Sequence, residues 1–289
     1  MRTEPLADTG SYSIPARGAS ADEVRRRRLR WLLVVLALGQ PISSLVFDWL
    51  SPTTLQSGAE FSPLVPPGAW FAIWGLIIVT SILWALLQAR PSTITPNPGI
   101  RDRLAGPLAV VFAGFALWLA TASLGQENPL GLLVFVMINS GHVVAWTRLV
   151  RARDEVAAWN PFERGILYLM MGVYAGWTSM AFFVQIATVT QGLGAPVDTA
   201  WGIVWQALVL AAATGTAVGF VYGTRGSIVY ALTVTYALVG VGISTGEAGL
   251  TALWVTCIAG VSIVWGALIV LRILDARADA RPLPTALRR

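Results

Sequence analysis

The sequence predicts an all-α, polytopic membrane protein with eight transmembrane helices. Hydrophobic residues make up 55% of the 289 residues and charged residues only 12%, and the mean hydropathy is +0.66. This composition is too apolar for an ordinary soluble domain. The chain contains eight continuous apolar runs, each close to the roughly 20 residues that a membrane-spanning helix requires. A β-barrel would instead show segments of about ten residues with alternating polarity, so helices are expected.

The predicted spans follow one another with mostly short connections. They are residues 31–50, 70–88, 104–124, 130–147, 165–188, 201–221, 227–245 and 251–272. The first span follows an arginine-rich stretch, as a signal peptide would, but no small-residue cleavage site follows it, so we expect it to remain as a helix. Only residues 51–69 and 148–164 form connections long enough to have structure of their own.

The basic residues predict the orientation of these spans. All twenty are arginines: seven precede the first span, three follow the second, four follow the fourth, one follows the sixth and five end or follow the eighth. Cytoplasmic loops collect Arg and Lys, so we expect both termini in the cytoplasm, residues 51–69 outside, and a location in the cell membrane. The arginines are spread over five segments and do not gather on one face, so nucleic acid is not an expected partner. The remaining loops and their borders carry only acids, namely Asp48, Glu60, Glu127, Asp198 and Glu247.

Small residues at four-residue spacing mark two of the predicted spans. They are Gly172 and Gly176 in the fifth span and Ala211, Gly215, Gly219 and Gly223 in the sixth. Such stripes let helices approach closely in lipid. We expect the last three spans to pack against the first five through the face of Gly215, Gly219 and Gly223, and a homodimer interface is the alternative.

Few residues could carry acid–base chemistry. His142 is the only histidine and lies within the fourth span, one turn after Asn139. It either contacts a ligand or forms a hydrogen bond to a neighbouring helix. No second histidine or intramembrane carboxylate accompanies it, so neither a metal site nor a catalytic pair is expected. Hydrolase and phosphate-loop motifs are absent, and the chain is therefore not expected to be an enzyme.

Tryptophan is abundant, with thirteen residues, and one stretch combines it with proline. In "PPGAWFAIWG", Trp70, Phe71 and Trp74 share a helix face directly after Pro66 and Pro67. Rigid prolines discourage helix before this point and would make a stiff lid over the helix ends. Trp70 stands near a span end, where anchoring at the membrane interface is an additional role.

Three motifs resemble the TspO/MBR family of tryptophan-rich sensory or translocator proteins. "PPGAWFAIWGLI" is similar to the signature that opens the second helix of that family, although Ile78 replaces the closing tyrosine. "ALWLATA" matches the third-helix pattern at Trp118, with Phe115 where the family has asparagine. "YAGWTSMAFFVQ" is similar to the fifth-helix pattern through Tyr174, Trp177, Ala181 and Gln185, the last in an asparagine position.

The resemblance covers about residues 31–190 and is closest to a longer branch of the family with extra C-terminal helices. It implies a TspO-like five-helix core at 31–190, three additional spans at 191–274, and tails at 1–30 (disordered, basic, cytoplasmic) and 275–289 (cytoplasmic). It also implies a pocket for a tetrapyrrole, a sterol or another planar apolar molecule beneath the loop after the first helix. No cofactor is required, and the expected partners are a hydrophobic small molecule and membrane lipid.

The family implies a sensor, a regulator or a transport-assisting protein. A small-molecule permease or exporter is the alternative function. We expect Phe71, Trp74, Trp118 and Trp177 to line one cavity under the prolines, with Tyr174 and Gln185 as polar contacts. The full set of candidate ligand-binding residues is Pro66, Pro67, Trp70, Phe71, Trp74, Trp118, His142, Tyr174, Trp177 and Gln185.

Overall fold

The computed structural model describes residues 21–51, 56–93, 99–125 and 127–279, and it is helical without strands throughout these ranges. Its helices are α1 Ala21–Leu50, α2 Ile73–Ala89, α3 Ile100–Ala122, α4 Leu130–Arg151, α5 Arg153–Ala157, α6 Pro161–Gly192, α7 Ala200–Gly223, α8 Ile228–Glu247 and α9 Thr251–Asp279. Two 3₁₀ turns, η1 Gly68–Ala72 and η2 Pro91–Thr93, flank α2. Eight helices in these ranges are long and apolar enough to cross a membrane, which confirms the predicted fold class.

The start of α1 corrects the predicted tail. Residues 21–30 were expected to be disordered, but they continue the first helix. Arg27 donates to Glu23 one turn earlier (2.7 Å), and buried Arg30 donates to Asp102 on α3 (2.8 Å) and to the Gln88 carbonyl oxygen at the end of α2 (2.9 Å). These contacts replace water around the arginine side chains, so the helix extends beyond the apolar run. The rest of the tail expected at 1–30, residues 1–20, lies outside the described residues. Of the tail expected at 275–289, residues 275–279 continue α9, and residues 280–289 lie outside the described residues.

Polar caps define where the later helices begin. The Asn160 side chain accepts the Phe162 N–H at the start of α6, and Pro161 occupies the first helical position. Thr199 and Ser227 accept backbone N–H groups in the same way at the starts of α7 and α8. Each cap satisfies a donor that the helix itself leaves free, which fixes short connections between long helices.

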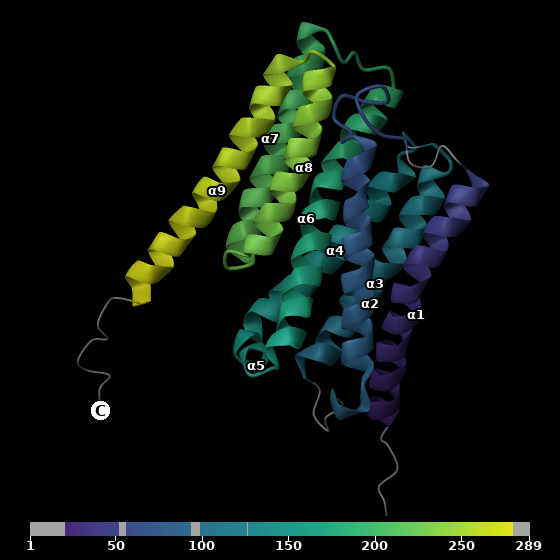
Figure 1. Ribbon diagram of the computed structural model, residues 1–289, viewed down its shortest axis with the longest axis vertical. Helices are drawn as coiled ribbons and strands as arrows, with labels where there is room; N and C mark the ends of the chain where they lie inside the picture. Colours follow the sequence, from purple (N-terminus) through teal and green to yellow (C-terminus); the bar gives the residue numbers. More distant parts are fainter. Residues whose placement is uncertain (1–20, 52–55, 94–98, 126, 280–289) are drawn as a thin grey trace, which may run out of the picture.

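Helix α6 is the central element of the molecule. It packs against α2 and α4 on one side and against α7 and α8 on the other, and α9 lies at the outer edge beside α7 and α8 (Figure 1). The first residues of α1 and the last residues of α9 point to the same end of the bundle, where α5 also lies (Figure 1). An even number of spans requires this arrangement.

The glycine contacts differ from those expected. A Cβ added at Gly172 would lie 2.7 Å from the Val229 Cβ, and one at Gly176 would lie 2.7 Å from the Thr233 Cβ, so these glycines hold α8 close to α6. Gly215, Gly219 and Gly223 have no atom within 4 Å of such a Cβ, and with Ala211 they form an exposed face of α7. The predicted packing of the last three spans through the face of Gly215, Gly219 and Gly223 was therefore wrong. Small residues permit close approach, but spacing alone does not tell which stripe is used.

Candidate ligand-binding site

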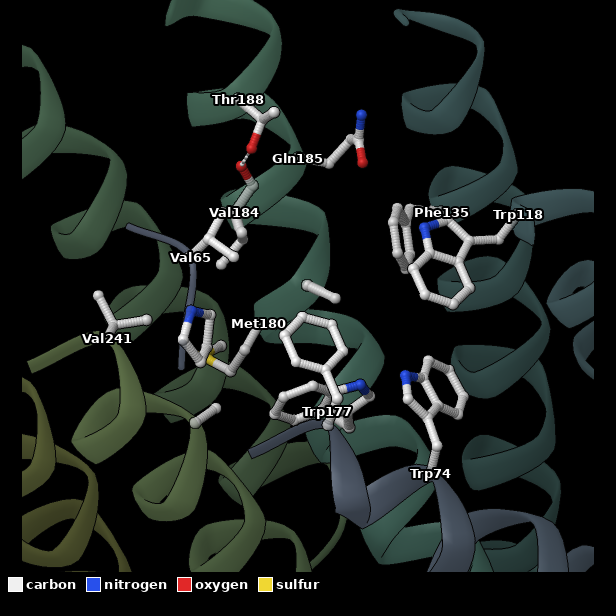
Figure 2. A pocket seen from close by; sticks show the side chains of 14 residues that line it. Val65, Trp74, Trp118, Phe135, Trp177, Met180, Val184, Gln185, Thr188 and Val241 are labelled. Carbon is white, nitrogen blue, oxygen red and sulfur yellow. Dashed lines mark hydrogen bonds between the residues drawn. The ribbon is translucent and has the colours of Figure 1, made fainter. Parts of the chain in front are cut away.

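A cavity lies beside Val65 and Pro66 of the loop of residues 56–67, between α2, α3, α4, α6 and α8 (Figure 2). The atoms around it border about 600 Å³ of space, which includes its opening to the surroundings, but only about 50 Å³ can hold the centre of a water molecule. Its walls are mostly apolar. They consist of Val65, Pro66, Phe71, Trp74, Trp118, Phe135, Trp177, Met180, Ala181, Val184, Gln185, Thr188, Ala237 and Val241.

Aromatic rings from η1 and four helices form one side of this cavity. Trp74 on α2 stacks on Trp118 of α3, with ring centroids 5.3 Å apart and planes at 24°. Trp74 and Phe71 both meet Trp177 of α6 edge to face, at 6.4 Å and 5.8 Å. Phe135 of α4 lies 6.1 Å from Trp118. Offset stacking and edge-to-face contacts are the favoured geometries of aromatic pairs, so the rings support one another.

The loop of residues 56–67 is anchored in the bundle. The Gly58 N–H donates to the Pro66 carbonyl oxygen (3.0 Å), which closes the loop on itself, and Gly58 has a φ of +83° that suits glycine. Leu64 and Val65 are 1% and 2% exposed. The loop is therefore packed into the bundle, and we call it the roof because Val65 and Pro66 close one side of the cavity.

Trp70 is held by α8 and does not line the cavity. Its ring stacks on Tyr236 at 5.6 Å, its indole N–H donates to the Tyr236 carbonyl oxygen (2.9 Å), and the Tyr236 hydroxyl donates to the Trp70 carbonyl oxygen (3.0 Å). This reciprocal pair clamps η1 to the seventh spanning helix. Pro67, the residue before η1, also lies outside the lining.

Tyr174 and His142 lie behind the aromatic wall. Tyr174 is fully buried, meets Trp74 edge to face at 5.9 Å, and its hydroxyl is 3.4 Å from the Val111 carbonyl oxygen that accepts its hydrogen bond. His142 is also fully buried, with its ring 5.2 Å from that of Tyr174. Neither imidazole nitrogen has a hydrogen-bond partner within the described part of the chain. The structure thus shows neither a cavity contact nor the expected hydrogen bond for His142.

Polar groups at the cavity are few. The Gln185 amide donates to the Asn128 carbonyl oxygen at 3.4 Å, and the Thr188 hydroxyl donates to the Val184 carbonyl oxygen at 2.9 Å. The Trp74 indole N–H is buried and lacks a partner among the described residues. Trp74 lines the cavity and faces Trp177 and Trp118 (Figure 2). An acceptor on a molecule bound in the cavity could therefore accept the hydrogen bond of the Trp74 indole N–H.

Six of the ten candidate residues therefore line the cavity: Pro66, Phe71, Trp74, Trp118, Trp177 and Gln185. Sequence reasoning missed Thr188, although it continues the helical spacing of Trp177, Ala181 and Gln185 on α6. It also missed Ala237 and Val241 on α8, which carry no local signal.

Comparison with known proteins gives one match. A family model described as TSPO-like protein matches residues 30–271, which are 242 of the 289 residues. The match extends over all eight spanning helices and is not limited to the first five. Neither the curated proteins nor the solved structures contain a match to this chain.

Proposed function

The chain belongs to the TSPO-like family of integral membrane proteins, and we propose that it binds a planar apolar molecule in the aromatic cavity. The ligand class is a tetrapyrrole, a sterol or an isoprenoid-like compound. In this proposal the protein acts as a sensor, a regulator or a transport-assisting protein in the cell membrane, with both termini in the cytoplasm.

The observation that carries the proposal is the arrangement of Phe71, Trp74, Trp118 and Trp177 around one cavity. Ring faces and edges on adjacent helices can contact a flat molecule on both of its sides. Binding sites for small molecules are typically apolar and aromatic with a few placed polar groups, which is the character of this wall.

The size of the cavity requires movement on binding. Pockets for drug-sized molecules have volumes of about 300–1,000 Å³. In this cavity the volume open to the centre of a water molecule is only about 50 Å³. A planar ligand must therefore separate the stacked rings of Trp74 and Trp118 or lift the roof. A side-chain hydrogen bond from Gln191 of α6 to the Phe61 carbonyl oxygen (3.3 Å) ties the roof to the bundle.

The wall chemistry supports binding without catalysis. Of the residues that the structure describes around the cavity, none is acidic, basic, a histidine or a cysteine. General acid–base catalysis needs a side chain that exchanges protons near neutral pH. The polar groups of Gln185, Thr188 and Trp74 can orient a ligand by hydrogen bonding but cannot play that role.

A titration of the full-length protein in lipid nanodiscs tests the proposal. Protoporphyrin, haem, a sterol and a carotenoid are added separately, and tryptophan fluorescence is recorded. Saturable quenching or a saturable spectral shift is expected for at least one planar compound, and none for a long n-alkane, an apolar control that is neither planar nor isoprenoid. Equal, non-saturating responses to all compounds would contradict the proposal. Flux of the bound compound in proteoliposomes would then indicate a permease.

A further inference from the structure

A second cavity lies at the end of the bundle where α5 is found. It is bounded by the end of α4, by α6, by the turn between α7 and α8, and by α9, and it has a volume of about 330 Å³. We call it the basic cavity. Its lining consists of Trp146, Val150, Arg153, Tyr168, Thr224, Arg225, Gly226, Ser227, Ile228, Val229 and Arg272.

Three arginines from different elements converge on the basic cavity. Arg153 begins α5, Arg225 lies in the α7–α8 turn and Arg272 lies on α9. No acidic residue is among the described lining residues, and neither Arg225 nor Arg272 forms an ion pair with any residue that the structure describes. Arg153 approaches Asp154 at 3.7 Å, but that carboxylate is 99% exposed. The cavity therefore carries uncompensated positive charge.

The arginines keep hydrogen-bond donors available. Arg272 uses one guanidinium nitrogen to donate to the Gly226 carbonyl oxygen (2.8 Å), which ties α9 to the turn. Its other N–H groups have no hydrogen-bond partner among the described residues. Tyr168 lines the same space. Arg225 has a φ of +58°, a conformation in which glycine or asparagine is usual. An arginine at this strained position presents a cation where the turn alone would favour a smaller residue.

The other walls of the basic cavity are apolar. Val150, Ile228 and Val229 face it beside the arginines, and Ile228 is half exposed at the start of α8. The cavity thus lies where spanning helices end, with charge and apolar surface side by side. This is the arrangement that a lipid needs, because its phosphate stays at the boundary while its chain enters the apolar layer.

We propose that the basic cavity binds the headgroup of an anionic phospholipid. Arg225 and Arg272 hold the phosphate by charge-assisted hydrogen bonds, and an acyl chain lies along Val150 and Val229. A free phosphate ion would use the arginines but not the apolar wall, so the lipid fits the whole lining. The inference does not depend on the ligand proposed for the aromatic cavity, from which the basic cavity is separate in lining residues.

Native mass spectrometry and thermal unfolding of the full-length protein in detergent test this site. The probes are phosphatidylglycerol, phosphatidylcholine and inorganic phosphate, added separately. We expect phosphatidylglycerol alone to remain bound and to raise the unfolding temperature. Arg225→Asn, which suits the positive φ, should weaken its binding about five- to tenfold.

Arg272→Gln should have a similar effect but also loses the bond to Gly226, so Arg225→Asn keeps the test independent of folding. Arg28→Gln is the matched control, because it removes one exposed arginine at the same end of the bundle on α1. Equal weakening in the control, or equal binding of phosphatidylcholine, would overturn the proposal. Stabilisation by inorganic phosphate equal to that by phosphatidylglycerol would indicate an anion site without lipid recognition and would also overturn it.

Discussion

Replacement of Gly176 by alanine should destabilise the protein by overpacking the contact between α6 and α8. The added Cβ would lie 2.7 Å from the Thr233 Cβ and 3.1 Å from the Tyr230 carbonyl oxygen. Non-bonded carbon atoms are normally about 3.5–4.0 Å apart, so one helix must move. The Tyr230 oxygen is backbone and cannot turn away as a side chain could.

Gly219→Ala is the matched control for this change. It makes the same substitution in a long helix, but nothing lies within 4 Å of the added Cβ. Alanine is better than glycine in a helix by about 0.5–1 kcal/mol, and this gain applies to both variants. The difference between their unfolding free energies therefore isolates the overpacking cost, which we expect to be about 1–3 kcal/mol.

The measurement is reversible unfolding in mixed detergent micelles, followed by circular dichroism at several protein concentrations. Gly176→Ala should unfold at lower denaturant than the parent, and Gly219→Ala at the same or slightly higher denaturant. Equal stability of the two variants would refute the view that α8 docks on α6 through close backbone approach. A concentration-dependent loss in Gly219→Ala would instead indicate a homodimer through the exposed face of α7.

Three further predictions concern the site and the topology. Trp74→Ala should weaken binding of a planar ligand roughly tenfold, since both a ring surface and the unpaired indole N–H donor are lost. Trp201→Ala at the exposed start of α7 should leave the ligand affinity measured by fluorescence unchanged, and similar effects of the two changes would make the deep rings ordinary core. Single cysteines at Ser57 and Ser92 in a cysteine-free background should be labelled by an impermeant thiol reagent in intact cells at Ser57 alone, and labelling of Ser92 would reverse the topology. His142→Phe should leave the unfolding temperature unchanged or raise it, because neither imidazole nitrogen is hydrogen-bonded to a described residue; a loss of several degrees would reveal an unseen partner.

The membrane spans could be predicted because each depends on a property of a whole segment. Hydropathy summed over about 20 residues tolerates local exceptions, and it located eight helices to within a few residues at most ends. The start of α1 was missed because Arg30 has charge that hydropathy counts against a helix, whereas its contact with Asp102 makes the residue compatible with burial.

The candidate site was predictable only in part. Phe71 and Trp74 share a helix face, which spacing reveals, and the motif similarity pointed to Trp118 and Trp177. Ala237 could not be predicted from the sequence. It is a small residue on α8, and its position at the cavity depends on the glycines of α6 that hold α8 close.

The preference of the aromatic cavity for a planar ligand over a lipid chain cannot depend on apolar burial alone. A molecule that arrives from the bilayer leaves surroundings as apolar as the cavity wall, so little free energy is gained by the transfer itself. Separation of Trp74 from Trp118 exchanges one stacked contact for contacts with the ligand, which is nearly neutral. What remains is the indole N–H of Trp74, which has no partner in the described structure and whose burial costs about 1–3 kcal/mol. A planar ligand with a carbonyl or carboxylate group can accept this hydrogen bond, whereas a lipid chain cannot, and this difference favours such a ligand over the surrounding lipid.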